Sequence, residues 1–260
     1  MGALRQEDRG PVRILTLQNP QKRNALDFAS LAELSAACAA AARDGVRCLV
    51  FRGAGEKAFC SGFDISAIPV GPQEGDRPDL AVERAMEAVE AVPCPTIAFL
   101  NGSAFGAGAE LATTCDLRVA RPGVALGMPP AKLGVVYAPP GLRRIVHLVG
   151  PSRAREMFFT GRPVEADEAL AIGLVDRVVP TDEAEAAALA LAAEIAGNAP
   201  LAVQGMKRIL RLLDAAAERG FTDAEREEIA ALRRRAFESD DVREGRDAFL
   251  AKRAPSFRGR

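Results

Sequence analysis

One segment near the middle of the chain, residues 96–116, constrains the fold more than any other. An apolar run suited to a buried strand, Thr96–Leu100, precedes a turn that ends in the four small residues Gly106–Ala109. Small residues at a strand-to-helix junction let the backbone approach another group closely, and the first N–H groups of a helix have no acceptor within it. A single carboxylate, Glu110, follows at once. The segment therefore predicts a strand, a tight turn and a helix whose start suits chemistry on a carbonyl oxygen.

Apolar runs of strand length alternate with helical patterns along most of the chain. The strand-like runs are Val12–Leu17, Val46–Phe51, Thr96–Leu100, Leu117–Ala120 and Val175–Val179. The helical patterns cover Phe28–Arg43, roughly Asp79–Val92 and Glu110–Cys115. Strands that alternate with helices predict an α/β fold with crossover connections.

The last third of the chain has a mostly helical composition. The expected helices run from Thr181 to Gly197, from Leu201 to Arg219, from a capping box at Thr222–Glu225, and from Asp240 to Arg253. We therefore predict a core over residues 1–195 and a C-terminal helical region over residues 196–260. A Pro- and Gly-rich stretch, Ile68–Pro78, is expected to be a surface loop.

The bulk composition excludes several classes of function. The 260 residues are 48% hydrophobic and carry a formal net charge of −1, which gives no global attraction to nucleic acid or to an anionic membrane. The acidic N-terminus does not resemble a signal peptide, and charges interrupt every apolar run before it reaches membrane-spanning length. Five cysteines without paired or metal-type spacing are expected to be reduced, buried thiols. We expect a cytoplasmic protein with no metal, no nucleic-acid partner and no membrane contact.

The single histidine also limits the chemistry. His147 is the only one in the chain, so any mechanism that needs two histidines is excluded. It lies in the helix-like stretch Arg143–Val149, which we expect to be structural and remote from the 96–116 segment.

A second glycine turn, at Ser61–Gly62, follows the strand that ends near Arg52. It is expected to leave the N–H of Phe63 unpaired at the start of a short helix. Together with an N–H from the Gly106–Gly108 turn, it gives two donors that can converge on one oxygen, and one such donor stabilises an oxyanion by roughly 3 kcal/mol. Either turn alone is weak evidence, because a helix start rich in Gly and Ala more often serves close packing than an active site.

Read together and in this order, the two turns resemble those of the crotonase superfamily, the enoyl-CoA hydratases and isomerases. The resemblance begins at Asn19–Leu26 and continues through both turns. It then covers Thr160–Asp176 and ends with Glu244–Arg253. It implies a spiral of ββα repeats with a C-terminal helical trimerisation region, assembled as a homotrimer or hexamer. It also implies an acyl-CoA substrate, with coenzyme A entering as part of that substrate and no permanently bound cofactor.

The resemblance assigns roles residue by residue. The oxyanion donors are the N–H groups of Phe63 and Ala107, where relatives usually have glycine at the second position, and Glu110 is the acid–base residue. Lys22 and Ala25 match the segment that contacts the nucleotide end of coenzyme A. Phe249 and Lys252 match residues near its phosphates, often supplied by a neighbouring subunit. The other positions implied to line the substrate site are Gly62, Asp64, Ile65, Gly106, Pro130 and Gly134.

One departure from the family pattern affects the expected reaction. Hydratases of this family use two glutamates on opposite sides of a water, and this chain has Pro130 where the second glutamate falls. Proline cannot transfer a proton, so the two-glutamate hydration mechanism is incomplete here. The known isomerases are disfavoured for the same reason.

The only tyrosine, Tyr137, stands three residues after Gly134, and this pattern resembles the methylmalonyl-CoA decarboxylase branch. That branch has a histidine where this chain has Phe63. Loss of CO2 from a malonyl-type thioester leaves an enolate that two N–H donors stabilise, and Tyr137 is expected to orient the departing carboxylate or else to be a core residue. The apolar pocket walls are expected to come from Phe63, Met128 and Val136. Burial of Glu110 is expected to raise its pKa, so that it can protonate the enolate.

Two alternatives remain open at this point. One is an enoyl-CoA hydratase that uses Glu110 and a water held by backbone groups. The other is a non-catalytic homologue that binds coenzyme A or RNA. The near-zero net charge argues against RNA binding, and Glu110 argues against a pure binding protein.

Overall fold

The structure is a computed structural model that describes residues 4–67, 77–129, 132, 136–216, 222–241, 244, 247–248 and 251–260. Within these residues a six-stranded sheet forms the centre of the molecule. Its order is β1 (Leu4–Arg9), β2 (Val12–Leu17), β3 (Cys48–Gly53), β5 (Thr96–Leu100), β7 (Leu117–Ala120) and β10 (Arg177–Val178). Strand β1 pairs with β2 in antiparallel orientation, and all other neighbours are parallel. The predicted α/β architecture is confirmed.

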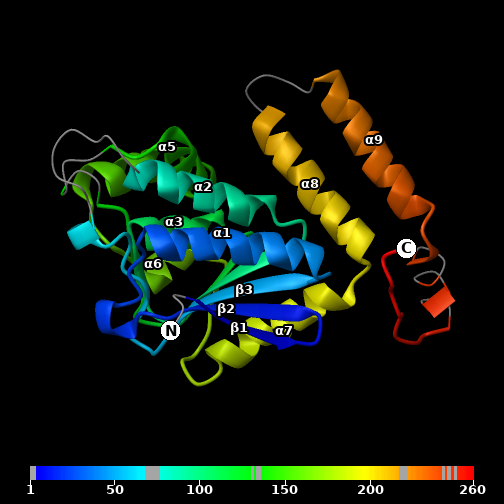
Figure 1. Cartoon of the computed structure of the whole chain (residues 1–260), viewed down its shortest axis with the longest axis horizontal. Helices are drawn as coiled ribbons and strands as arrows, with labels where there is room; N and C mark the ends of the chain where they lie inside the picture. Colours follow the sequence, from blue (N-terminus) through cyan, green and yellow to red (C-terminus); the bar gives the residue numbers. More distant parts are fainter. Residues whose placement is uncertain are drawn as a thin grey trace.

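Alternate side chains of the central strands enter two different cores. On β2, Leu15 and Leu17 face one apolar cluster, whereas Val12 and Ile14 face the other, as the two-residue period of a strand requires. The first cluster is covered by α1 (Phe28–Arg43), α2 (Pro78–Ala91), α3 (Ala107–Thr114) and α5 (Pro139–Thr160). The second is covered by α7 (Ala184–Gly197) on the opposite face, so that helices enclose the sheet from both sides (Figure 1).

A second, smaller sheet runs beside the first and was not expected from the sequence. Its order is β4 (Ala58–Cys60), β6 (Ser103–Phe105), β8 (Ala125–Gly127) and β9 (Val164–Glu165). Strands β4, β6 and β8 are parallel neighbours, and β9 closes the sheet in antiparallel orientation to β8. Each of these strands has three residues or fewer, too short for a two-residue apolar alternation to be visible in the sequence. This smaller sheet matters for the site, because its strands β4 and β6 end at the two glycine turns.

Several predicted boundaries are confirmed and others move by a few residues. The strands Val12–Leu17, Thr96–Leu100 and Leu117–Ala120 and the helix Phe28–Arg43 have the predicted bounds. Strand β3 starts and ends two residues later than predicted, and α3 begins three residues earlier. Short elements complete the fold: η1 (Pro20–Lys22), η2 (Ile65–Ala67) and α6 (Ala166–Ala171). The loop expected over 68–78 lies mostly outside the described residues. The helix expected over 240–253 is described in part: residues 240, 241, 244, 247 and 248 are helical, whereas residues 251–253 are not.

The C-terminal helices α8 (Pro200–Ala216) and α9 (Asp223–Phe237) stand outside the layered core as a side-by-side pair (Figure 1). The predicted capping box is confirmed, since the Thr222 N–H donates to Glu225 Oε2 at 2.8 Å and the Glu225 N–H donates to Thr222 Oγ1 at 3.3 Å. The division of the chain between residues 195 and 196 stays a prediction.

A buried lysine ties α8 to the central sheet. Lys207 Nζ lies 2.7 Å from Asp116 Oδ2 and 2.9 Å from the Cys94 carbonyl oxygen. The same carboxylate oxygen accepts from the N–H of Thr96 at 2.7 Å. The lysine side chain is only 8% exposed, so its charge depends on these partners.

We expect the Lys207→Met variant to unfold more easily, because it removes the ammonium and leaves Asp116 without its cation. The cost is about 2 kcal/mol of unfolding free energy, typical for a hydrogen bond to a charged group. Chemical denaturation measures it, with exposed Lys57→Met as the control. Equal stability of the two variants would show that α8 is not held by this contact.

Two further expectations concern the chain as a whole. All five cysteines are free and buried, as predicted, and burial raises the pKa of each thiol.

Across the described residues, no single helix is both long and apolar enough to cross a membrane. One pair, α7 with α8, meets that criterion only when both are counted together, and it is bent by 105°.

Candidate active site

The smaller sheet brings the two glycine turns together. Because β4 and β6 are parallel neighbours, the turns that follow them emerge at the same edge. Gly62 has a φ of +100°, and a Cβ on it would lie 2.8 Å from the Phe105 carbonyl oxygen and 3.4 Å from the Ala107 nitrogen. A side chain at Gly62 is therefore excluded by both the backbone conformation and the space. The two turns predicted from the sequence are in contact.

The N–H of Phe63 points away from its neighbouring strand. In the parallel bridge between Leu26 and Phe63, Leu26 makes both hydrogen bonds: its N–H donates to Gly62 at 2.8 Å, and its carbonyl accepts from Asp64 at 2.7 Å. The N–H of Phe63 is thus directed to the other side of the bridge. Within the described part of the chain, it has no backbone acceptor. The ring of Phe63 packs edge-on against Phe28 at 5.2 Å.

The N–H of Ala107 is the first of helix α3. Gly106 precedes it with φ 53° and ψ −125°, a conformation open to glycine, and the first helical N–H groups have no acceptor inside their own helix. Gly108 has a different role, because a Cβ there would lie 2.4 Å from the Cys60 carbonyl oxygen. The small-residue run therefore serves close packing at Gly108, and at Ala107 it leaves an N–H without an acceptor inside its own helix.

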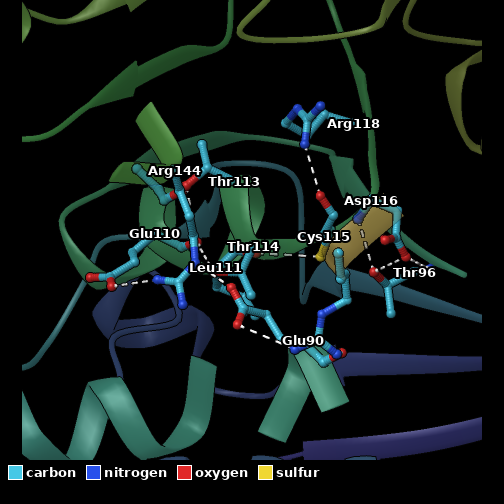
Figure 2. A network of polar contacts seen from close by, with 12 residues as sticks. Glu90, Thr96, Glu110, Leu111, Thr113, Thr114, Cys115, Asp116, Arg118 and Arg144 are labelled. Carbon is cyan, nitrogen blue, oxygen red and sulfur yellow. Dashed lines mark hydrogen bonds and ion pairs between the residues drawn. The ribbon is translucent and has the colours of Figure 1, made fainter. Parts of the chain in front are cut away.

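Glu110 lies one turn into α3 with its carboxylate mostly buried. Its side chain is 12% exposed, and Oε1 accepts a hydrogen bond from Arg144 Nη1 at 3.1 Å (Figure 2). A Cβ on Gly141 of α5 would lie 2.8 Å from Oε1, so α5 approaches the carboxylate as closely as glycine allows. Burial raises the pKa of Glu110 despite the opposing Arg144 charge, and the carboxylates of Glu83 and Glu90 add to the rise. The predicted direction of this shift is confirmed.

Arg144 is a site residue that the sequence did not predict. The stretch Arg143–Val149 was expected to be remote from the 96–116 segment, and this is wrong, since Arg144 contacts Glu110 directly. The guanidinium also donates from Nε to Glu90 Oε1 at 2.7 Å (Figure 2). Glu83 and Glu90 are seven residues apart on α2, a spacing that places them on one helical face. That spacing was visible in the sequence, but the packing of α2 and α5 around α3 was not. His147 is exposed on the same helix.

Tyr137 reaches the start of α3. Its hydroxyl oxygen would lie 3.5 Å from a Cβ on Gly106, next to the Ala107 donor. Among the described residues this hydroxyl has no hydrogen-bond partner, and the ring packs edge-on against Phe158 at 6.5 Å. Burial, with a smaller contribution from the Glu110 charge, raises the pKa of Tyr137 to about 12. The phenol is therefore a neutral donor at neutral pH.

The segment expected to contact the nucleotide lies beside the Phe63 turn. Lys22 Nζ is 2.6 Å from Asp64 Oδ2, and the N–H of Ala25 donates to the Lys22 carbonyl at 3.1 Å. The Lys22 ammonium and the hydroxyl and N–H of Ser66 lower the pKa of Asp64 to about 2. Asn24 holds this loop in place through its buried side-chain amide, which donates to the carbonyl oxygens of Ala54 and Ala58.

The remaining predicted residues lie outside the described residues, are described only by their backbone, or lie elsewhere in the chain. Pro130, Gly134 and Phe249 lie outside the described residues, and only the backbone of Ile65, in η2, is described. Lys252 is exposed in the C-terminal segment 251–260. That segment lies at the opposite end of the molecule's long axis from η1 (Figure 1).

The three residues expected to form the pocket walls differ in how far they are buried. Met128 is buried in the core at 1% exposure and Phe63 is partly buried, but Val136 is 90% exposed. Val136 therefore does not form an apolar wall within one chain. No group of three or more metal-ligating side chains occurs among the residues described.

Comparisons with known proteins identify the family of the chain. The family description Enoyl-CoA hydratase/isomerase matches residues 7–260. The chain is 32% identical over 249 residues to the methylmalonyl-CoA decarboxylase of Escherichia coli, covering 95% of each chain. It is 35% identical over 206 residues to the short-chain-enoyl-CoA hydratase of Clostridium acetobutylicum, covering 78% of this chain and 79% of the relative. A crystal structure of an enoyl-CoA hydratase/carnithine racemase from Magnetospirillum magneticum superimposes with a TM-score of 0.92 at 34% identity, covering 100% of this chain and 97% of that one.

The fold and the paired turns define a crotonase-type enzyme, and the chain belongs to the enoyl-CoA hydratase/isomerase family. It is an acyl-CoA enzyme of this family.

Proposed function

We propose that this enzyme decarboxylates a short malonyl-type coenzyme A thioester. The thioester oxygen is held between the N–H groups of Phe63 and Ala107. The observation that carries this proposal is the hydroxyl of Tyr137 beside Gly106, which has no hydrogen-bond partner among the described residues and lies within reach of a group bound at those two donors. A free neutral donor at that position suits a substrate carboxylate.

The proposed reaction needs only the groups that meet at these turns. The bond between the α-carbon and the substrate carboxylate breaks, CO2 leaves, and the electron pair moves onto the α-carbon and the thioester carbonyl. The two N–H donors stabilise the resulting enolate oxygen. Glu110, whose pKa is raised by burial, then gives its proton to the α-carbon and is reprotonated from water.

The remaining assignments support substrate binding. We propose that Lys22 exchanges part of its contact with Asp64 for a phosphate of coenzyme A, with Ala25, Gly62, Ile65 and Gly134 lining the same path. Phe249 and Lys252 are proposed to reach the coenzyme of a neighbouring chain, because the C-terminal segment lies far from η1 within one chain (Figure 1). This arrangement requires assembly as a homotrimer or hexamer.

Enoyl-CoA hydration by Glu110 is the second candidate. Relatives and solved structures named enoyl-CoA hydratase support it. So does Glu83, a second carboxylate close enough to raise the pKa of Glu110. Against it stands Pro130, which cannot act as an acid or base where hydratases carry their second glutamate.

One assay separates the two reactions. Malonyl-, methylmalonyl- and ethylmalonyl-CoA are offered beside crotonyl-CoA, and CO2 release and hydration are measured. We expect CO2 release from at least one malonyl-type thioester at a turnover well above that on crotonyl-CoA. Hydration of crotonyl-CoA at enzyme-like turnover with no CO2 release would refute the decarboxylase and support the hydratase.

We expect the Tyr137→Phe variant to lose activity toward malonyl-type thioesters by about tenfold, the value of one modest hydrogen bond of about 1.4 kcal/mol. Thermal stability should not fall, because the hydroxyl has no partner among the described residues. Steady-state kinetics and thermal denaturation test both statements. A loss of stability without loss of activity would make Tyr137 a core residue instead.

A further inference from the structure

The buried carboxylate of Glu110 is held from one side only. Arg144 Nη1 donates to Oε1 at 3.1 Å, while Oε2 has no hydrogen-bond partner within the described chain. Both side chains are nearly closed to solvent, at 10% exposure for Arg144 and 12% for Glu110. The contact therefore fixes the rotation of the carboxylate and leaves a defined oxygen available for proton transfer.

Arg144 is itself fixed by a second carboxylate. Its Nε donates to Glu90 Oε1 at 2.7 Å, so the planar guanidinium bridges two carboxylates on α2 and α3 (Figure 2). Glu90 is held in turn from α8, because Arg211 donates to its carbonyl oxygen and lies 3.7 Å from its Oε2. A continuous chain of charged groups thus leads from Glu110 to the C-terminal helices.

We propose that Arg144 is a positioning residue for Glu110 and that Glu90 keeps Arg144 in the orientation this requires. The inference rests on the proposed catalytic role of Glu110 but not on which reaction Glu110 serves. In this proposal Arg144 acts through Glu110 and does not itself contact the substrate.

The charges around Glu110 predict how substitutions of Arg144 and Glu90 should change its pKa. The groups that face the carboxylate are Arg144 from α5, Glu83 and Glu90 from α2, and Tyr137 from the segment before α5. The Arg144 charge opposes the rise in the pKa of Glu110, whereas Glu90 adds to it. Arg144→Gln should therefore raise the pKa of Glu110 further. Glu90→Gln should lower it, because the amide oxygen can still accept from Arg144 Nε and hold the guanidinium in place while the negative charge is removed.

The pH profile of activity should move with the pKa of Glu110, whichever protonation state of Glu110 is active. If protonated Glu110 is the active form, activity is lost as pH rises through its pKa. That limb of the pH profile then moves to higher pH in Arg144→Gln and to lower pH in Glu90→Gln. If the ionised form is active, activity is lost as pH falls, and the limb moves in the same two directions.

The experiment measures the titration of Glu110 and the turnover in parallel. The carboxyl carbon of Glu110 is followed by carbon-13 NMR without substrate, with Glu110→Gln used for the assignment. We expect opposite pKa shifts in Arg144→Gln and Glu90→Gln, and a fall of about 10²-fold in kcat for Arg144→Gln, the cost of a small misplacement of a catalytic group. Arg144→Lys keeps the positive charge but loses the planar guanidinium that bridges Glu110 and Glu90. It should titrate near the wild-type pKa and still lose turnover.

The neighbouring Arg143→Gln is the matched control, since Arg143 is exposed on the same helix. It should change neither the titration nor kcat. Shifts of the pKa in one common direction, or unchanged kcat in both Arg144 variants, would overturn the proposal. Should Arg144→Gln fail to fold, Arg144→Lys and Glu90→Gln carry the test. The titration needs no turnover, so its result stands even if malonyl-type thioesters prove not to be substrates.

Discussion

The Glu110→Gln variant is expected to lose turnover by about 10³-fold, within the range that general acid–base catalysis contributes. The amide has nearly the same shape as the acid but cannot deliver or accept the proton. It still accepts a hydrogen bond from Arg144, so the helix start and the two N–H donors should remain in place. Affinity for an unreactive acyl-CoA should therefore change little.

The control for this variant is Glu87→Gln, an exposed glutamate on α2. Single-turnover kinetics and titration calorimetry with butyryl-CoA separate catalysis from binding. Turnover within a few-fold of wild type in Glu110→Gln would remove Glu110 from the mechanism and leave the backbone donors as the only chemistry at the site.

The Gly62→Ala variant is expected to lose activity by about 10² to 10³-fold, the effect of losing one oxyanion donor. The added Cβ would lie 2.8 Å from the Phe105 carbonyl oxygen and 3.4 Å from the Ala107 nitrogen, so the two turns must separate. The φ of +100° adds backbone strain of about 1 to 2 kcal/mol, which lowers stability as well.

Gly123→Ala is the control for that strain. Gly123 has a φ of +73°, but a Cβ there meets nothing within 4 Å. It should lose stability by a similar amount while activity stays near wild type. Equal activity of the two alanine variants would show that the contact between the turns does not shape the oxyanion site.

Five of the six strands of the larger sheet and most helices could be predicted because their sequence signals are local, whereas the mostly polar edge strand β1 was not predicted. Val12–Leu17 and Thr96–Leu100 are apolar over a full strand length. The helix Phe28–Arg43 is preceded by the N-cap residue Asp27, whose side chain accepts from the N–H of Ser30. The two glycine turns could be predicted for the same reason. Their pairing could only be inferred from the family resemblance, because it depends on the three-residue strands β4 and β6.

The surroundings of Glu110 were beyond sequence reasoning. Arg144 is one of two adjacent arginines, and nothing local distinguishes it from exposed Arg143. Its contact with Glu110 follows from the packing of α5 on α3 at Gly141, where the absence of a side chain leaves room for the Glu110 carboxylate. Tyr137 was identified through its position in a motif, whereas the place of its hydroxyl beside Gly106 is a property of the folded chain.

Infrared spectroscopy can show whether the N–H groups of Phe63 and Ala107 polarise one thioester oxygen. Butyryl-CoA labelled with carbon-13 at the thioester carbonyl is bound to the wild-type protein and to Gly62→Ala. We expect the carbonyl stretch to move to lower frequency on binding to the wild-type protein, and this shift to be largely lost in Gly62→Ala. A bound carbonyl that absorbs at the same frequency as in water would show that these two N–H groups do not polarise the thioester.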